Sequence, residues 1–234
     1  MRALLALVLF SLLGFACAGG APSSVEPAKG ESLRYLALGD SYTIGEGVPP
    51  AERWPVQLAA RLRRQGIALG EPEIIARTGW TVAELSAGMD AAAPRGPYDL
   101  VTLLIGVNDQ YRGADPEAYR PAFARMLTRA TALAGGDARR VVVLSIPDWG
   151  VTPFARQSGR DPARIAAEID RFNVVNRQEA EKAGIRFVDI TPLSRRAEEE
   201  PALLAPDGLH YSGAMYGEWV GVVRVGVVEA ITRP

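Results

Sequence analysis

Residues 33–42 read LRYLALGDSY. The mostly apolar run 33–38 is typical of a strand that is buried on both faces of a sheet. The run ends at Gly39, and the polar residues Asp40 and Ser41 follow it directly. In a doubly wound sheet, residues in this place lie at the carboxyl ends of the strands, where such folds bind their ligands. The stretch therefore predicts a buried first strand that leads into a polar turn.

Four further apolar runs repeat this arrangement along the chain, and helical patterns lie between them. The runs cover residues 73–76, 100–105, 141–146 and 185–190. An alternation of strands and helices favours a parallel sheet with helices on both faces. We therefore expect the α/β class, as a three-layer α/β/α sandwich with a mainly parallel five-stranded sheet, flavodoxin-like in topology.

The expected helices have recognisable ends. Asp115 and Asp161 are each followed by proline, so a capping carboxylate precedes a proline at the first helical position. Ser212 is placed to cap a last helix, and residues 54–65 are predicted to be helical as well. Gly184 is expected to stop the helix that begins after Asp161.

The composition limits the kinds of partner and site. The chain has 234 residues, 48% of them hydrophobic, with 26 Lys and Arg against 27 Asp and Glu. This is the composition of one globular domain, and it lacks the basic excess that a nucleic-acid partner requires. Cys17 is the only cysteine and His210 the only histidine. A disulfide within the chain and a Cys/His metal cluster are therefore excluded. These counts do not exclude a metal site built from carboxylates alone, but we expect neither a metal nor another cofactor.

The first residues have the layout of an export signal. Arg2 precedes an apolar run over residues 3–15, which is too short to span a bilayer comfortably. We expect a signal peptide over residues 1–17, a tether rich in Gly, Ala, Pro and Ser over 18–31, and one folded domain over 32–234.

Cys17 can end this leader in two ways. The sequence LGFAC at 13–17 resembles a bacterial lipobox, in which Cys17 becomes the lipidated first residue of the mature protein. Alternatively, cleavage after Ala18 removes the cysteine. We favour the lipoprotein, which predicts an exported protein of the cell envelope rather than a freely secreted or periplasmic one. Its membrane attachment would then be through the N-terminal lipid alone.

Ser41 and His210 form the first candidate pair for catalysis. A serine hydroxyl is a poor nucleophile at neutral pH and needs a base, a role that suits histidine with its ordinary pKa of about 6.5. Asp207 lies three residues before His210, so a single turn can bring its carboxylate to the imidazole and orient it. Taken alone, each of these short motifs is more often a turn or a helix cap than a catalytic residue.

Two further polar motifs follow the second and third apolar runs. They are RTGWT at 77–81 and GVND at 106–109. Acyl transfer builds negative charge on a carbonyl oxygen, and the backbone amide of Gly79 and the side chain of Asn108 are donors that can stabilise it. The alternative is again an ordinary turn at the end of a strand.

Together, the four motifs resemble those of the SGNH hydrolases, also called the GDSL family. The resemblance covers nearly the whole chain after residue 33. It rests on GDS at 39–41, Gly79, GVND at 106–109 and DGLH at 207–210. It implies an SGNH hydrolase domain that cleaves carboxylic esters through a serine nucleophile and needs no cofactor.

The resemblance also implies a role for each matching residue. Ser41 is the nucleophile, His210 is its base, and Asp207 orients the base. The oxyanion hole consists of the backbone amides of Ser41 and Gly79 and the side-chain amide of Asn108.

The surroundings of these motifs are less specific. The family often carries Asn-x-Gly shortly before the oxyanion glycine, whereas this chain has IIA at 74–76. Asp40 and Asp109 are interpreted as structural hydrogen-bonding partners. Four side chains are expected to line the substrate pocket, although each is as readily ordinary packing: Ile44, Trp80, Tyr111 and Trp149.

The identity of the ester is the least determined property. The chain is too short for a large lid over the site, which favours a small or short-chain acyl ester as the substrate. The alternatives are a carbohydrate O-deacetylase, a lysophospholipase or thioesterase, and a non-catalytic module of the same fold that binds a glycan or lipid. The full set of Ser41, Asn108, Asp207 and His210 argues against a module that only binds.

Overall fold

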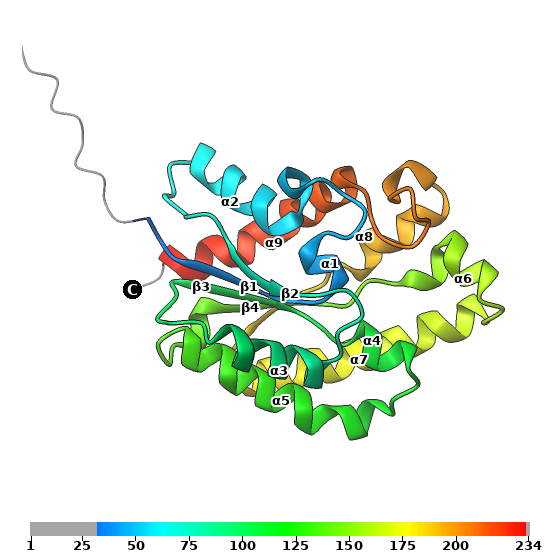
Figure 1. The fold of residues 1–234 in the computed structure, drawn as a ribbon, viewed down its shortest axis with the longest axis horizontal. Helices are drawn as coiled ribbons and strands as arrows, with labels where there is room; N and C mark the ends of the chain where they lie inside the picture. Colours follow the sequence, from blue (N-terminus) through cyan, green and yellow to red (C-terminus); the bar gives the residue numbers. More distant parts are fainter. Residues whose placement is uncertain (1–31, 233–234) are drawn as a thin grey trace, which may run out of the picture. The chain divides into compact units, whose positions relative to one another are not determined.

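The computed structural model describes residues 32–232, and at their centre lies a parallel sheet of five strands (Figure 1). The strands are β1 Tyr35–Gly39, β2 Glu73–Ala76, β3 Leu100–Leu104, β4 Val141–Leu144 and β5 Arg186–Val188. Their order in the sheet is β2-β1-β3-β4-β5, and every neighbouring pair is parallel. Each strand overlaps one of the five predicted runs, so the predicted fold class is confirmed.

Burial separates the central strands from the edge strands. Every residue of β1, β3 and β4 is buried, whereas β2 and β5 include exposed or half-buried positions. This pattern explains why the central strands are the most continuously apolar, since helices cover both of their faces. In register, Gly39 at the end of β1 lies opposite Ala76 of β2 and Leu104 of β3. The residues that follow these three strands are therefore brought to one edge of the sheet.

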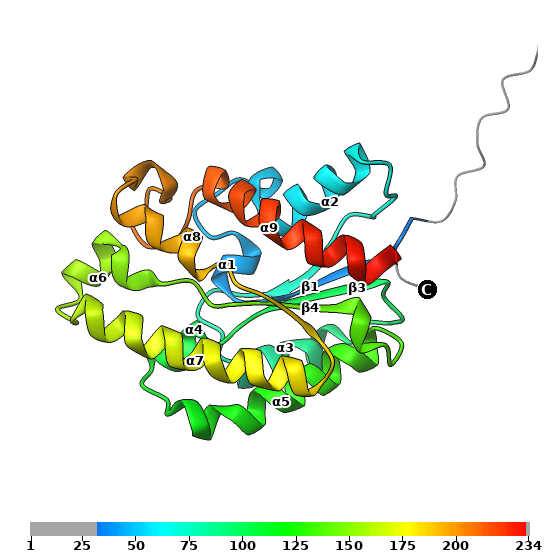
Figure 2. The ribbon, with the colours of Figure 1, turned by 180° about the vertical axis from the view of Figure 1, so that it is seen from behind.

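Helices form a layer on each face of the sheet (Figures 1 and 2). One layer contains α2 Trp54–Arg64 and α9 Gly213–Thr232, which pack against each other. The other contains α3 Val82–Ala92, α5 Pro116–Leu133 and α7 Pro162–Lys182. These layers complete the predicted α/β/α sandwich.

The predicted helix caps are present in the structure. Asp115 accepts hydrogen bonds from two backbone N–H groups of the first turn of α5, and Asp161 accepts one from Ala163 at the start of α7. Ser212 Oγ accepts from Met215 N at 3.4 Å at the start of α9. The helix α3 was not predicted from the sequence, although Thr81 and Glu84 form a complete capping box at its start.

Short helices connect the strands to the longer ones. Four are α-helical: α1 Ser41–Ile44, α4 Val107–Tyr111, α6 Pro153–Gln157 and α8 Thr191–Arg195. Five are single 3₁₀ turns, at Pro50–Glu52, Ala138–Arg140, Trp149–Val151, Arg196–Glu198 and Pro201–Leu203. Within residues 32–232, no helix combines the length and the hydropathy needed to cross a membrane. The predicted signal peptide, tether and Cys17 lie outside the described residues.

Candidate active site

A cavity of about 150 Å³ lies beyond the carboxyl ends of the central strands. It brings together residues from four distant segments of the chain. The lining residues are Ser41, Tyr42, Val107, Asn108, Tyr111, Trp149, Phe154, Leu209 and His210. Three of the predicted catalytic or oxyanion residues thus share one cavity: Ser41, Asn108 and His210.

Ser41 begins α1 in a sharp turn that only glycine permits. A Cβ atom on Gly39 would lie 2.6 Å from the carbonyl oxygen of Leu104, so the turn approaches β3 too closely for any side chain. Asp40 caps α1, because its Oδ1 accepts a hydrogen bond from Tyr42 N at 3.0 Å. Among the described residues, the backbone N–H of Ser41 has no acceptor. The turn therefore presents both the hydroxyl and the amide of Ser41 for binding.

His210 is held by Asp207 within one turn of backbone. Its Nδ1 lies 2.6 Å from Asp207 Oδ2, and Asp207 Oδ1 accepts the backbone N–H groups of Leu209 and His210, each at 2.9 Å. Burial raises the pKa of Asp207, but the bonds from His210 and from the backbone outweigh burial and hold it below its usual value. An ionised Asp207 that engages Nδ1 leaves Nε2 as the nitrogen that can exchange a proton.

The Ser41 hydroxyl and His210 line the same cavity without a hydrogen bond between them. Both residues are buried, with 5% of the surface of Ser41 and 6% of that of His210 exposed. A hydrogen bond of this kind often forms only when substrate occupies the site. The lack of a direct hydrogen bond is therefore compatible with proton transfer from Ser41 to His210.

Gly79 lies in a turn beside the cavity and is not among its lining residues. Trp80 N donates to Arg77 O at 3.2 Å and closes the turn, in which Gly79 has a φ of 84°. A positive φ at this position favours glycine. Within residues 32–232, the backbone N–H of Gly79 has no acceptor, so it remains available as a donor.

Asn108 links this turn to the cavity. One N–H of its side-chain amide donates to the carbonyl of Trp80 at 3.0 Å. An amide nitrogen carries two hydrogens, so a second donor remains at the cavity wall. Asp109 Oδ2 accepts from Val82 N at 3.0 Å and holds the start of α3, in agreement with its predicted structural role.

Asp40 and Asp109 lie under the site in a desolvated environment. Burial raises the pKa of Asp40 to about 8, and the nearby Asp109 carboxylate adds to the increase. Burial likewise raises the pKa of Asp109 to about 6. Among the described residues, Asp40 Oδ2 has no hydrogen-bond partner, so the bond from Tyr42 N to Oδ1 offsets only part of the cost of burying the ionised carboxylate.

The raised pKa of Asp40 predicts that the protein loses stability as the pH rises. An unfolded Asp has a pKa of about 3.9, so between pH 4 and 8 the folded state holds a proton that the unfolded state releases. In this window each pH unit lowers the free energy of unfolding by about 1.4 kcal/mol. Asp40→Asn, which keeps the acceptor for Tyr42 N, should therefore melt increasingly above the parent between pH 5 and pH 8. Thermal melts at several pH values measure this difference. The exposed Asp90→Asn is the control, and a parallel shift at all pH values would contradict the prediction.

Aromatic side chains form part of the cavity wall. The Trp149 ring contacts Tyr111 at a centroid distance of 5.3 Å and Phe154 at 6.0 Å. Trp149 Nε1 donates to Gln110 Oε1 at 2.8 Å, which fixes the indole. The guanidinium of Arg160 covers the Tyr111 and Trp149 rings at 5.2 and 5.4 Å. The wall is therefore apolar and firmly supported.

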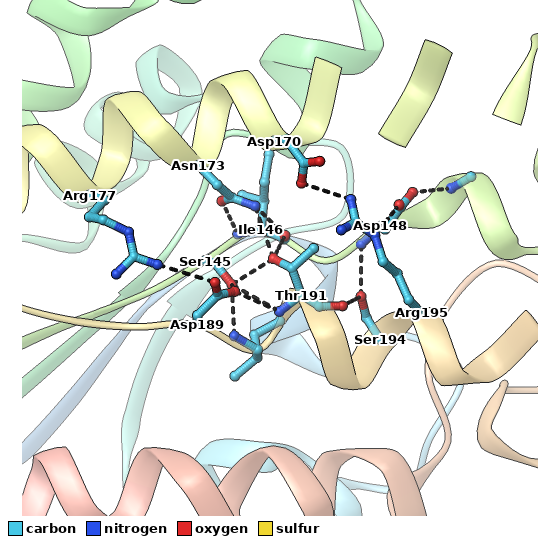
Figure 3. Close-up of polar contacts among 12 residues, drawn as sticks. Ser145, Ile146, Asp148, Asp170, Asn173, Arg177, Asp189, Thr191, Ser194 and Arg195 are labelled. Atoms are coloured by element: carbon cyan, nitrogen blue, oxygen red, sulfur yellow. Dashed lines mark hydrogen bonds and ion pairs between the residues drawn. The ribbon is translucent and has the colours of Figure 1, made fainter. Parts of the chain in front are cut away.

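A polar network holds the segment between β4 and Trp149 (Figure 3). The Asn173 side chain of α7 accepts from Ile146 N at 2.8 Å and donates to Ile146 O at 3.0 Å. Arg195 of α8 binds Asp148 Oδ2 at 2.9 Å. These bonds join β4 to two helices and set the position of Trp149.

The structure corrects part of the predicted pocket wall. Tyr111 and Trp149 line the cavity, but Ile44 and Trp80 do not. Ile44 lies at the far end of α1, and the Trp80 indole packs against α3, where a Cβ on Gly88 would overlap it. Only the Trp80 carbonyl takes part, through its bond to Asn108.

Four lining residues were not predicted from the sequence, namely Tyr42, Val107, Phe154 and Leu209. Three of them are immediate neighbours of predicted site residues, and this adjacency was the available signal. Phe154 has no such signal, because its place depends on the bond from Phe154 N to Gly208 O at 3.0 Å. Residues 32–232 contain no cluster of three or more His, Cys, Asp or Glu side chains that could hold a metal.

Comparison with known proteins relates this geometry to a family. Residues 37–217 match the GDSL-like lipase/acylhydrolase family, and no curated protein matches the chain. The crystal structure of TesA superposes with a TM-score of 0.67 and 20% identity, covering 84% of this chain and 99% of TesA. A variant of Axe2, an acetyl xylan esterase from Geobacillus stearothermophilus, gives a TM-score of 0.62 at 20% identity, with 86% and 97% covered.

A third solved structure is the psychrotrophic esterase EstA from Pseudoalteromonas sp., with a TM-score of 0.62 and 15% identity. The superposition covers 86% of this chain and 97% of EstA. At these identities the structural similarity concerns the fold, whereas the family match spans most of the chain. The chain belongs to the GDSL-like lipase/acylhydrolase family.

Proposed function

We propose that this protein is a serine esterase that hydrolyses carboxylic esters of small or short-chain acyl groups through an acyl-enzyme. The observation that carries the proposal is the shared cavity, in which Ser41, Asn108 and an Asp207-bound His210 lie together. A nucleophile, a base with its orienting carboxylate and a preorganised donor are the parts that acyl transfer requires.

In the first half-reaction, His210 Nε2 takes the proton of Ser41 Oγ as this oxygen attacks the ester carbonyl. The carbonyl oxygen becomes an oxyanion, which accepts hydrogen bonds from the amides of Ser41 and Gly79 and from Asn108. The tetrahedral adduct then expels the alcohol, whose oxygen receives the proton from His210. Asp207 stabilises the imidazolium that exists between the two transfers.

In the second half-reaction, water attacks the acyl-Ser41 carbonyl and gives its proton to His210. The new adduct breaks its bond to Ser41 Oγ, which regains the proton, and the carboxylic acid is released. The enzyme returns to its starting state, and the net change is one ester and one water converted to one acid and one alcohol.

The cavity favours a short acyl group. Its volume of about 150 Å³ is below the 300–1,000 Å³ or so of sites for drug-sized ligands, and its wall of Tyr111, Trp149, Phe154 and Leu209 is apolar. A carbohydrate O-deacetylase is the second candidate, because an acetyl group fits this volume and two of the similar structures are acetyl xylan esterases. In either case the ester is a small molecule or part of a glycan or lipid. We also propose export and a lipid anchor at Cys17, on the basis of the leader sequence.

The purified protein should hydrolyse p-nitrophenyl acetate and butyrate, with kcat/KM falling for octanoate. Acetylated xylan, assayed by acetate release, tests the second candidate. A fluorophosphonate that labels Ser41 gives an independent readout of the nucleophile. A protein that neither hydrolyses any of these esters nor reacts with the fluorophosphonate would contradict the proposal.

Phe154 should limit the length of the acyl chain. Its ring lines the cavity and packs against Trp149, so Phe154→Ala opens space for further methylene groups. Each buried methylene contributes about 0.8 kcal/mol, and room for two should raise the octanoate-to-acetate ratio of kcat/KM about tenfold. The matched control is Phe187→Ala on β5, because Phe187 packs against Arg177 and does not line the cavity. An unchanged ratio in Phe154→Ala would place the acyl chain elsewhere.

A further inference from the structure

The turn that carries the Gly79 amide has few constraints of its own. It lies between β2 and α3 and is closed by a single backbone bond, from Trp80 N to Arg77 O. A Cβ atom built on Gly79 would meet nothing within 4 Å, so no packing limits this residue. Glycine also has the widest backbone freedom. The direction of its N–H therefore depends on bonds from neighbouring elements.

Those bonds come mostly from α4. Its Asn108 donates to Trp80 O at 3.0 Å, and Arg112 Nη2, from the C-cap residue of the same helix, donates to Gly79 O at 2.8 Å. Asp109 holds Val82 N at the other end of the loop. Thus one short helix binds successive backbone groups of the loop.

Arg112 donates the hydrogen bond to Gly79 O and also forms an ion pair that fixes its guanidinium. Its guanidinium pairs with Glu84, with N–O distances of 3.1 and 3.2 Å. Glu84 in turn accepts from Thr81 N at 2.8 Å and completes the capping box of α3. A planar guanidinium suits this bridge, because it can hold a carboxylate and a carbonyl in fixed directions at once.

On the opposite side, Thr78 Oγ1 donates to Glu46, which follows α1. The loop is thus tied to the segment that carries Ser41 and to the helix that carries Asn108. Those two segments supply the other oxyanion donors. Of these hydrogen bonds to the loop, the one from Arg112 is made to Gly79 itself.

We propose that Arg112 is a positioning residue of the oxyanion hole, holding Gly79 so that its N–H points to the oxyanion; this rests on the proposed esterase function. Arg112 touches neither the substrate nor the reacting atoms, and its side chain is half exposed and does not line the cavity. Arg112 therefore contributes to catalysis only near the transition state, in which negative charge develops on the carbonyl oxygen. It should therefore change kcat and leave substrate binding unchanged.

The test compares Arg112→Ala with the parent in hydrolysis of p-nitrophenyl acetate and in inhibition by butaneboronic acid. This acid forms a tetrahedral adduct with a nucleophilic serine and places an oxygen in the oxyanion hole. Loss of one complete oxyanion donor costs about a hundredfold or more, so a misplaced donor should lower kcat about tenfold. We expect KM to stay within about twofold and the inhibition constant to rise by the same factor as kcat falls.

Arg129→Ala is the matched control. Arg129 also joins a backbone carbonyl of α3, that of Ser86 at 3.0 Å, with a carboxylate, that of Asp90 at 2.6 Å. It makes no bond to the Gly79 loop. The variant Arg129→Ala should lose about as much stability as Arg112→Ala while keeping the kcat and the boronate affinity of the parent. If Arg112→Ala does not fold, Arg112→Lys replaces it, because lysine keeps the charge but does not form the two-sided bridge.

The outcomes separate the two proposals. An active parent in which Arg112→Ala keeps its kcat and boronate affinity overturns the role of Arg112 alone. An increase in KM with unchanged kcat also overturns it. A parent with no esterase activity and no Ser41 labelling overturns the proposed function and this inference with it. A selective loss of kcat and boronate affinity supports both.

Discussion

Replacing Ser41 with alanine is expected to lower kcat for ester hydrolysis by at least about 10⁴-fold, because the attacking oxygen is removed and only binding and the oxyanion donors remain. The backbone amide of residue 41 is retained, so KM should change little. Covalent labelling by a fluorophosphonate should disappear completely. Kinetics with p-nitrophenyl butyrate and mass spectrometry of the labelled protein measure the two effects.

His210→Ala should cause a loss of similar size, since the Ser41 hydroxyl then has no base. The double variant Ser41→Ala/His210→Ala should be no worse than either single variant, because residues that act as one unit are not additive. Ser158→Ala removes an exposed hydroxyl outside the cavity and is the control. Activity that survives in Ser41→Ala would identify a different nucleophile.

Asn108→Ala should lower kcat by about 10²- to 10³-fold, which is the usual effect of losing one oxyanion donor. The amide of Asn108 lines the cavity and has one N–H beyond the bond to Trp80 O. Because the charge on the carbonyl oxygen exists only near the transition state, KM for p-nitrophenyl acetate should stay nearly constant. Steady-state kinetics separates the two parameters.

Asn108→Ala also breaks the bond to Trp80 O, and Arg112→Ala, which loosens the same loop but keeps the Asn108 amide, is the control for loop displacement. Asn108→Asp has nearly the same shape but accepts where asparagine donates, and its negative charge opposes the oxyanion. We expect Asn108→Asp to be at least as inactive as Asn108→Ala, although Ser41 is unchanged in both variants. An effect confined to KM in both variants would move Asn108 from the oxyanion hole to the substrate-binding wall.

The fold could be predicted because its signals are local. Each buried strand is a short apolar run, and Asp115 and Asp161 mark helix starts by a capping side chain followed by proline. The helix α3 was missed because its hydrophobic pattern is short and mixed with small residues, so its capping box was the better signal. The strand order β2-β1-β3-β4-β5 does not follow from the α/β alternation, because doubly wound sheets occur in more than one order.

The candidate site could be predicted only in part, for a physical reason. Ser41, Asn108 and His210 follow strands or precede the last helix, and the topology alone brings such positions together. The direction of a side chain within its turn depends on tertiary contacts. Trp80 shows this, since its indole packs on α3 and leaves only its carbonyl to the site. The hydrogen bond from Arg112 to Gly79 could not be predicted either, because no sequence motif relates these two segments.

The cavity also has a consequence for the time at which a newly made chain can become active. Ser41 follows the first strand, whereas His210 lies just before α9, the last helix of the described chain. A nascent chain that is still being synthesised therefore contains the proposed nucleophile without its proposed base, even when most of the sheet has formed. Hydrolytic capacity should arise only when the C-terminal segment docks. During refolding, ester turnover should accordingly recover later than far-UV circular dichroism, and would report completion of the native state.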